Sequence, residues 1–339
     1  MQQLTYVGAR ELEWRDAPEP ELSSDAAALV RPVAVATCDL DALIVAGRTP
    51  FQPPFPIGHE CVAEVLDVGD AVATLRAGQL VSVPFQISCG ACEACRRGRT
   101  GNCSGVAPMS TFGFGPAVGR WGGFLSDQVC VPYAEHMLVA VPEGLEPSAV
   151  ASASDNISDA WRTVGPTLAE EPGAPVLVVG GAGPGSIGLY AAALAVALGA
   201  ESVLYVDTDA ERRRIAEALG AETLAEAPKR LGPYPITVDS SADPAGLAMA
   251  LRSTAPDGTC TSTGIYFGEQ PVLPLLEMYT KGITFRTGRV HARAAMPGVL
   301  ALAAQGALHP ELVTTRVVPW ADAPDALLER GWTKLVIER

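Results

Sequence analysis

Residues 175–207 read PVLVVGGAGPGSIGLYAAALAVALGAESVLYVD, and this stretch decides the fold. An apolar run ends in a glycine-rich turn, an alanine-rich helical segment follows, and a second apolar run ends in an aspartate. Two later segments, AERRRIAEALGA (210–221) and TCTSTGIYFG (259–268), continue the alternation of helix and strand. Such alternation is typical of a parallel sheet with helices on both faces, so the sequence predicts a doubly wound α/β domain in this half of the chain.

The glycine-rich turn carries the spacing that binds a dinucleotide. Gly183, Gly185 and Gly188 satisfy the pattern GxGxxG between a strand and a helix, where small residues let a pyrophosphate approach the helix N-terminus. The residues predicted to line the cofactor are Gly181, Gly183, Gly185, Ser186, Ile187 and Gly188. The alternative is a plain strand-to-helix turn without a ligand.

Asp207 indicates which dinucleotide binds. It ends the strand after the turn, 19 residues beyond Gly188, where a carboxylate accepts hydrogen bonds from the adenine ribose and repels a 2′-phosphate. NAD(H) is therefore the favoured cofactor. Arg212 and Arg213 follow closely, and an arginine beside this pocket can accommodate the extra phosphate, so NADP(H) stays open.

The chain before the dinucleotide segment has a different pattern. Up to about Val141 it reads as short strands broken by glycine and proline, for example ALVRPVAVAT (28–37), which predicts a β-rich domain. The tail after residue 293 contains the strand-like segments TRVVPW (315–320) and TKLVIER (333–339). We expect this tail to return to the first domain.

Four cysteines lie in the run CGACEACRRGRTGNC at residues 89–103. They are Cys89, Cys92, Cys95 and Cys103, with two, two and seven residues between them. Tetrahedral zinc needs four thiolates at about 2.3 Å, and short Cys-x-x-Cys steps supply them by turning the chain around the ion. The spacing therefore predicts a closed structural zinc lobe. The alternative, a disulfide cluster, requires an oxidising compartment.

Composition argues against several classes of partner. The 339-residue chain has a net charge of −14 and only three lysines, so no basic stripe is available to hold a nucleic acid backbone. No run of about eighteen apolar residues predicts a membrane span, and the N-terminus lacks the basic flank and apolar core of a signal peptide. We expect no nucleic acid partner, no membrane partner and a reducing, cytoplasmic location.

Two further short segments accompany the lobe and the glycine-rich turn, CDLD (38–41) and GHE (58–60). Taken in order, these pieces resemble the zinc-containing medium-chain dehydrogenase/reductase superfamily, the alcohol dehydrogenase-like enzymes, over essentially the full chain. The resemblance implies a small-molecule substrate and a homodimer or homotetramer. It also implies two domains. They are a GroES-like β-rich catalytic domain at residues 1–156 and 294–339, and a Rossmann NAD(P)-binding domain at residues 157–293.

The resemblance also implies a catalytic metal. In that superfamily a cysteine, a histidine and one further residue bind a catalytic zinc, and Cys38 and His59 stand at the first two positions. The run SASDNISDAW (152–161) resembles the formaldehyde dehydrogenase-like branch, which uses an aspartate as the third ligand. Asp155 is therefore the implied third ligand, and together with the lobe we expect two zinc ions per chain.

Other residues are implied to support that metal. Glu60 follows His59 and lies beside the ion, and Asp41 holds the His59 ring and its tautomer. Phe85 matches a position that forms one wall of the substrate pocket, with a core phenylalanine as the alternative. Lys334 resembles a C-terminal basic residue that contacts the cofactor pyrophosphate, with an ordinary solvated lysine as the alternative.

Four positions depart from the superfamily pattern, one of which is Asp39, an acid directly after the zinc cysteine. Members often carry a Ser or Thr and then a His shortly after the zinc cysteine, and this relay carries the alcohol proton to solvent. Here those positions are Leu40 and Leu43, which cannot carry a proton. Asp159 stands where a Thr commonly packs by the nicotinamide, and it is a candidate for proton transfer or for attracting a cationic substrate group. The alternative is that Asp159 caps or anchors the adjoining helix.

The leading hypothesis is a zinc-dependent oxidoreductase that transfers a hydride between NAD(P)(H) and an alcohol or carbonyl substrate. The alternative is an NAD(P)H-dependent reductase of a C=N or conjugated C=C bond in the same fold, in which zinc only positions the substrate. A third hypothesis is a cofactor-binding protein without turnover. Metal analysis separates the third from the others, because two zinc ions per chain favour an enzyme.

Overall fold

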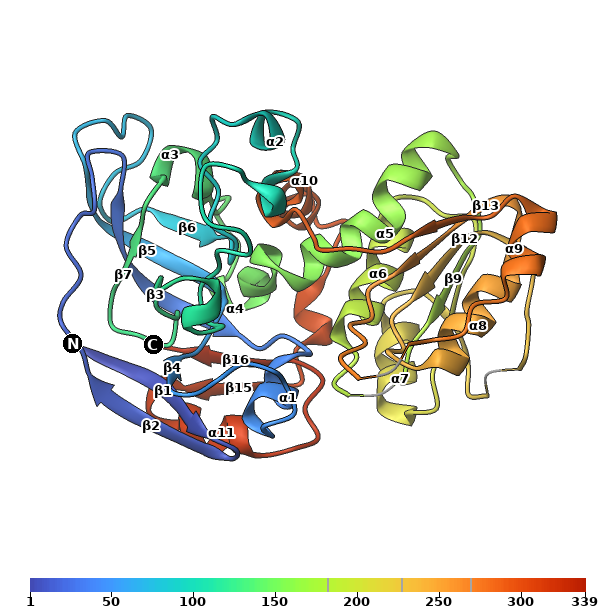
Figure 1. Ribbon diagram of the computed structural model, residues 1–339. Helices are drawn as coiled ribbons and strands as arrows, with labels where there is room; N and C mark the ends of the chain where they lie inside the picture. Colours follow the sequence, from blue (N-terminus) through green and yellow to red (C-terminus); the bar gives the residue numbers. More distant parts are fainter. Residues whose placement is uncertain (182, 227, 269) are drawn as a thin grey trace. The chain divides into compact units, whose positions relative to one another are not determined.

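A computed structural model of the chain describes residues 1–181, 183–226, 228–268 and 270–339. The chain forms two compact units (Figure 1). The first unit comprises Met1–Ser158, Val290–Ala304 and Thr314–Arg339, and the second comprises Asp159–Arg289 and Gln305–Val313.

The boundaries of the units differ from the expected domains at three segments, of which residues 157–158 were expected in the Rossmann domain and lie in the first unit. The sequence assigns residues 305–313 to the catalytic domain, whereas the structure has them in the second unit. The reason is local packing, because the 3-10 helix η4 (Pro310–Val313) packs against helix α6 (Ser186–Ala197). Residues 290–293 differ in the opposite direction, since they lead into helix α10 (Ala292–Ala304) of the first unit.

The first unit is built on two sheets. Its strands are β1 (Gln2–Gly8), β2 (Glu11–Asp16), β3 (Ala28–Ala36), β4 (Phe55–Pro56), β5 (Glu60–Val68), β6 (Leu80–Val83), β7 (Val129–Val131), β8 (Val139–Ala140), β15 (Arg316–Pro319) and β16 (Leu335–Glu338). The larger sheet has the order β15-β16-β3-β5-β6-β8, with β7 also paired to β3, and the smaller has the order β2-β1-β4. Aliphatic and aromatic side chains from both sheets form one core.

Two strand pairings in the larger sheet determine where Cys38 and His59 lie. Strand β16 pairs with β3 in antiparallel register, with Val336 opposite Ala36, so the tail returns to the first unit as expected. Strands β3 and β5 are also antiparallel, and Ala36 lies opposite Glu60. The end of β3 therefore meets the start of β5, which brings Cys38 and His59 to the same edge of the sheet.

Short helices connect these strands. They are α1 (Asp41–Val45), α2 (Glu93–Arg96), α3 (Ala134–Met137), α4 (Pro147–Val150) and α11 (Ala323–Leu328), with the 3-10 helices η1 (Thr100–Asn102), η2 (Pro116–Val118), η3 (Ala151–Ser154) and η5 (Trp320–Asp322). Helix α5 (Asn156–Glu170) begins in the first unit and continues into the second.

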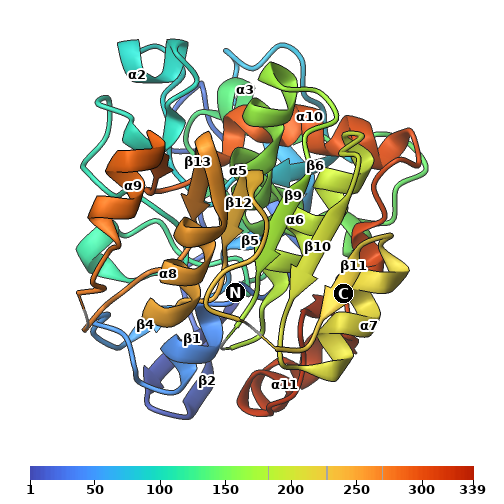
Figure 2. The same cartoon turned by 90° about the vertical axis from the view of Figure 1, so that its right-hand side faces the viewer.

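The second unit is a six-stranded parallel sheet. Its strands are β9 (Val176–Val179), β10 (Val203–Val206), β11 (Glu222–Leu224), β12 (Tyr234–Asp239), β13 (Thr254–Ser262) and β14 (Thr284–Arg286). They run in the order β11-β10-β9-β12-β13-β14, and Figure 2 shows β9 between β10 and β12. This order is that of the Rossmann fold, and it confirms the doubly wound parallel sheet that the sequence predicts.

Helices flank this sheet on both faces. They are α6, α7 (Ala210–Ala218), α8 (Pro244–Ser253) and α9 (Leu275–Lys281). Because the strand order runs outward from β9 in both directions, right-handed crossovers place α6 and α7 on one face and α8 on the other. Among the residues that the structure describes, no helix has the length and apolarity that crossing a membrane requires.

Candidate metal and cofactor sites

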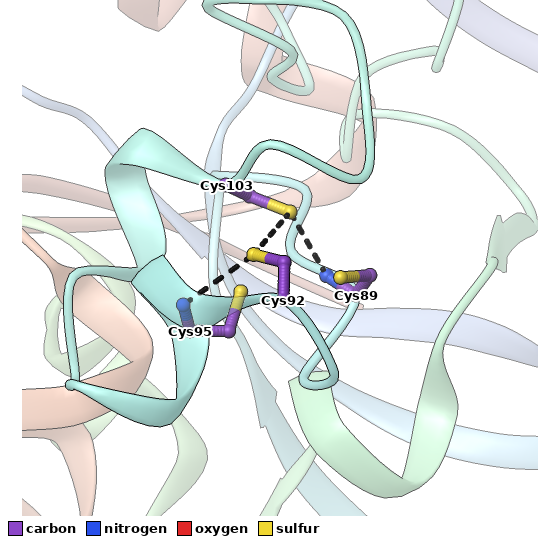
Figure 3. Close-up of side chains that lie close together, drawn as sticks. All are labelled: Cys89, Cys92, Cys95 and Cys103. Atoms are coloured by element: carbon purple, nitrogen blue, oxygen red, sulfur yellow. Dashed lines mark hydrogen bonds between the residues drawn. The ribbon is translucent and has the colours of Figure 1, made fainter.

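The four cysteines of the lobe converge as the sequence predicts. Figure 3 shows Cys89, Cys92, Cys95 and Cys103 with their sulfur atoms turned toward one another, and all four ligand atoms lie within 4.8 Å of each other. The Sγ atoms of Cys92 and Cys103 are 3.8 Å apart. Thiolates at about 2.3 Å from a tetrahedral ion are separated by about 3.8 Å, so this arrangement fits a four-thiolate metal site.

Backbone N–H groups of the lobe point at its sulfur atoms. The Cys103 sulfur accepts from the N–H of Cys89 and of Gly105, both at 3.3 Å. Cys92 caps helix α2, and its sulfur accepts from the N–H of Cys95 at 3.5 Å. A Cβ at Gly105 would lie 2.6 Å from the Cys89 sulfur, so only glycine fits there. These contacts favour sulfur in its anionic form, which is the form that binds metal.

A second cluster lies at the edge where β3 ends and β5 begins. The ligand atoms of Cys38, His59, Glu60 and Asp155 all lie within 4.8 Å of one another, and all four residues are buried. Asp155 directly follows η3, which is tied to β5 because the Cys61 N–H donates to the Ser154 hydroxyl at 2.9 Å. Three separate chain segments therefore deliver one compact donor set.

The imidazole of His59 is held by carboxylates on both sides. Its Nδ1 lies 3.6 Å from Asp41 Oδ1, and its Nε2 lies 3.5 Å from Asp155 Oδ2. Asp41 is itself fixed, because its Oδ2 accepts from the Cys38 N–H at 2.7 Å. Both ring nitrogens are fully buried without a hydrogen-bond partner, and such orphaned nitrogens are uncommon unless an ion completes the site.

Acidic groups crowd this cluster. Burial raises the pKa of the Cys38 thiol well above its ordinary value, and the neighbouring carboxylates raise it further. Burial also raises the pKa of Glu60 to about 8, although the Lys334 ammonium opposes the rise. Burial disfavours a charged His59, yet the carboxylates around it outweigh burial and raise its pKa to about 9. A divalent cation would relieve this crowding, and the sulfur, nitrogen and oxygen donors fit zinc.

Lys334 belongs to the same cluster. It is not the solvated lysine of the alternative, and its buried ammonium is held by side chains and a carbonyl of the first unit rather than presented to a cofactor pyrophosphate as predicted. The side chain is fully buried, and its ammonium donates to both carboxylate oxygens of Glu60 at 3.1 and 3.3 Å. It also donates to the Thr37 carbonyl and, at 2.7 Å, to Asn156 Oδ1. Sequence reasoning missed Asn156, although it is an amide directly after Asp155.

Aromatic rings cover one side of His59. The ring centroids of Phe85 and Phe114 lie 5.9 and 4.4 Å from that of the imidazole, and both side chains are buried. Phe51 extends the group, at 5.3 Å from Phe114. Sequence reasoning missed Phe114, for which the only signal was the pair of aromatics in FGFG. Leu40 is half-buried and packs against the core of this unit.

Asp159 lies in the second unit, in the first turn of α5. Its carboxylate pairs with Arg162, which also donates to the Ser262 carbonyl at 3.3 Å. The pair thus ties α5 to the end of β13, which agrees with the anchoring alternative for Asp159.

The predicted dinucleotide turn connects β9 to α6. Gly181, Gly183, Gly185, Ser186, Ile187 and Gly188 lie between the end of β9 and the first turn of the helix. Gly183 and Gly185 have φ of +77° and +75°, a region that favours glycine. A Cβ at Gly185 would lie 2.8 Å from Cδ of Arg212, so the arginine side chain crosses the turn closely.

Asp207 and Arg212 form a tight pair beside this turn. Asp207 is buried, and Arg212 donates to both of its oxygens, from Nε at 2.7 Å and from Nη2 at 2.9 Å. The Tyr205 hydroxyl and the Asp209 N–H donate to it as well, at 2.7 and 2.8 Å. These four donors fill the acceptor sites of the carboxylate.

The same guanidinium also reaches the turn. It donates to the carbonyls of Gly181 and Gly183, at 2.7 and 2.9 Å. The sequence predicts an acid open to ribose hydroxyls, whereas in this structure Arg212 neutralises that acid and bridges it to the glycine-rich turn.

Comparison with known proteins agrees with this geometry. Residues 24–143 match the alcohol dehydrogenase GroES-like domain, and residues 186–305 match the zinc-binding dehydrogenase family. L-threonine 3-dehydrogenase of Streptomyces coelicolor is 30% identical, with 76% of this chain and 75% of that protein aligned. The alcohol dehydrogenase TADH from Thermus sp. ATN1 superposes with a TM-score of 0.87 at 27% identity, covering 100% of this chain and 99% of that one.

A further relative is the glutathione-independent formaldehyde dehydrogenase of Pseudomonas aeruginosa, which is 32% identical over 230 residues. That match covers 65% of this chain and spans only 57% of the length of the relative. Together with the two domains and the two clusters of candidate metal ligands, these matches show that the chain belongs to the zinc-containing medium-chain dehydrogenase/reductase superfamily of oxidoreductases.

Proposed function

We propose that the chain is a zinc-dependent oxidoreductase that interconverts an alcohol and a carbonyl compound, with NAD(P)(H) accepting or donating the hydride. One observation carries this proposal: the buried convergence of Cys38, His59 and Asp155, with the imidazole Nε2 buried without a hydrogen-bond partner. These three residues are the proposed catalytic ligands, and the cysteine lobe is the proposed second, structural site. A zinc ion held by three protein ligands supplies a Lewis acid with a position left for substrate oxygen.

The remaining residues of the cluster have proposed roles around those ligands. Asp41 orients the His59 ring through Nδ1, and Glu60 balances the charge of Lys334 beside the ligands. Phe85 and Phe114 supply an apolar wall that excludes water from the imidazole side of the cluster. A wall of this kind suits a substrate whose carbon skeleton is apolar.

Activity measurements test the proposal directly. The protein is incubated with NADH and NADPH against panels of aldehydes, imines and enones, and with NAD⁺ and NADP⁺ against alcohols. We expect turnover of aldehydes and alcohols. Leu40 and Leu43 favour a second candidate, reduction of a C=N or conjugated C=C bond, because neither side chain can carry an alcohol proton. Turnover confined to imines or enones would establish that second reaction instead.

We propose NAD(H) as the preferred cofactor, with NADP(H) accepted through Arg212. Replacing Arg212 with alanine leaves the Asp207 carboxylate without its guanidinium partner, so a 2′-phosphate meets an unbalanced negative charge. A charge-assisted hydrogen bond contributes about 1.5–3 kcal/mol, which corresponds to about 10- to 100-fold in affinity. We expect Kd for NADPH to rise by that factor, and Kd for NADH to change by less than about threefold. Fluorescence titration with each cofactor measures both.

Arg214→Ala is the matched control for that change. It removes one positive charge from the same helix, but Arg214 is exposed and pairs only with Glu211 on the surface among the contacts described. Both cofactors should bind this variant as they bind the wild type. An equal loss of affinity for NADH and NADPH in Arg212→Ala would show that Arg212 only supports the turn.

We propose that the protein forms a homodimer or homotetramer through the second unit. Strand β14 is the last strand of its sheet, and α9, which precedes it, has no buried residue. Val272, Leu276 and Tyr279 are 87, 76 and 85% exposed. An open strand edge beside exposed apolar side chains is a surface that a second copy of the chain can cover.

Leu276→Glu should shift the protein toward the monomer, because it places a charge within that apolar surface. Light scattering coupled to size-exclusion chromatography measures the mass. Met109→Glu, at an exposed apolar residue of the first unit, is the control and should keep the wild-type mass. A wild-type monomer, or an unchanged mass for Leu276→Glu, would rule out this interface.

The eight cysteines all lie in the described part of the chain and none of them forms a disulfide, which is the state that a reducing compartment maintains. On this basis we propose a cytoplasmic location, with small molecules as the binding partners.

A further inference from the structure

We propose that Asn156 is a positioning residue that sets the donor strength of Cys38 and fixes the carboxylate of Asp155. This inference rests on the proposed function for the identity of the metal ligands. It goes beyond that function because it assigns control of metal affinity and Lewis acidity to an amide that does not itself bind the ion.

Hydrogen-bond chemistry decides how the Asn156 amide is oriented. The side chain is buried, and its Oδ1 lies 2.7 Å from the Lys334 ammonium. An ammonium can only donate, so the amide oxygen must face it. The NH₂ group therefore faces the opposite way, toward Cys38 Sγ and Asp155 Oδ2, each at 3.2 Å.

Lys334 prevents the Asn156 amide group from flipping by about 180°. The Lys334 ammonium also donates to the Thr37 carbonyl and to the Glu60 carboxylate, which hold it in place. The side chains of Glu60 and Lys334 are both fully buried. Thr37 immediately precedes Cys38, and Asn156 is the first residue of α5. A buried chain of polar contacts thus runs from Glu60 through Lys334 and Asn156 to the sulfur of Cys38.

The amide acts on the ligands in two ways. An N–H group that donates to a thiolate stabilises the anionic sulfur, which is the form that binds metal, and it withdraws some charge, which leaves more positive charge on a bound ion. The same NH₂ group fixes the rotation of the Asp155 carboxylate, whose Oδ2 also faces His59. Groups that orient metal ligands in this way are commonly worth 10- to 100-fold in metal affinity.

Cadmium-113 NMR of the full chain tests the proposal, because each metal site gives its own resonance. The wild type loaded with cadmium should show two signals, one from the four-thiolate lobe and one from the Cys38 cluster. Asn156→Leu keeps the approximate volume but has no N–H donor. We expect it to move the cluster resonance, to leave the lobe resonance in place, and to lower cadmium affinity at the cluster by about 10- to 100-fold in chelator competition.

Two additional variants complete the experiment. Asn156→Ala also removes the N–H donor, and its smaller side chain avoids any steric clash that a leucine would introduce. It should therefore move the cluster resonance in the same way. Thr163→Val is the control, because Thr163 is a buried residue of the same helix whose hydroxyl donates to the Ala160 carbonyl away from the cluster. It should leave both resonances unchanged.

The outcomes distinguish a failure of the role proposed for Asn156 from a failure of the proposed function. A wild-type cluster resonance and wild-type affinity in both Asn156 variants would overturn the role of Asn156 and leave the proposed function standing. A wild type that binds cadmium only in the lobe would overturn the proposed function itself, and with it this inference.

Discussion

Replacing Cys38 with alanine should lower kcat/KM for the best substrate by at least about 10³-fold and reduce the zinc content from two ions per chain to one. The thiolate is one of three proposed ligands, and without it His59 and Asp155 form an incomplete site. Loss of the Lewis acid removes several kcal/mol of transition-state stabilisation, and about 4 kcal/mol corresponds to about 10³-fold in rate. Steady-state kinetics and elemental analysis of the same preparation measure the two effects.

Cys260→Ala is the control for the loss of a buried thiol. Cys260 lies in the core of the second unit, on β13, and belongs to neither cluster of candidate metal ligands. This variant should keep two zinc ions and turnover within about twofold of the wild type. A wild type with one zinc ion and no turnover would favour the cofactor-binding protein without activity. Full activity in Cys38→Ala would exclude the proposed site.

Replacing Cys103 with serine should lower the free energy of unfolding by at least about 4 kcal/mol, because loss of a structural metal belongs to the most destabilising class of substitutions. Cys103 accepts N–H bonds from both Cys89 and Gly105, so it joins the two ends of the lobe. The midpoint of thermal unfolding should fall by roughly 10 °C, measured by differential scanning calorimetry. Zinc content should fall by one ion per chain.

Cys130→Ser is the matched control, since it makes the same atomic change at a half-buried cysteine of the same unit. Its sulfur lies 3.5 Å from the Ser23 hydroxyl and outside both clusters. It should keep its metal and unfold within about 2 °C of the wild type. If Cys103→Ser kept two zinc ions and the wild-type melting temperature, the lobe would not be a structural metal site.

The sequence predicted features that depend on short stretches of chain. The strand, turn and helix of residues 175–207 follow one another directly in the sequence, so their pattern alone predicted a doubly wound parallel sheet, although not the order of its strands. The four-cysteine lobe could also be predicted from the sequence, because all four cysteines fall within residues 89–103. In both cases a local spacing is enough to specify the geometry.

The Cys38 cluster could not be predicted from spacing, because its donors come from three distant segments. The register of β3 against β5 brings Cys38 to His59, and η3 adds Asp155, so only the family resemblance pointed to it. Lys334 was harder still, since a lysine near a chain end is usually solvated. Its burial depends on the pairing of β16 with β3.

The position of Arg212 depends on side-chain packing, which sequence patterns do not report. Its charge indicated a phosphate partner, whereas the structure pairs it with Asp207 and two turn carbonyls. The end of the second unit was missed for a similar reason, because the packing of η4 on α6 leaves no periodic signal in residues 305–313.

The pairing of β16 with β3 also fixes the order in which the protein can assemble during synthesis. Cys38, His59 and Asp155 leave the ribosome early, but the strand that brings Lys334 to the same cluster is made much later. Most of the second unit emerges between these two events and can begin to fold first. Until β16 docks, the acidic groups of the cluster lack their buried counter-charge. The complete Cys38 cluster, with its buried counter-charge, is therefore a late product of synthesis, whereas all four cysteines of the proposed metal lobe are present once Cys103 has been made.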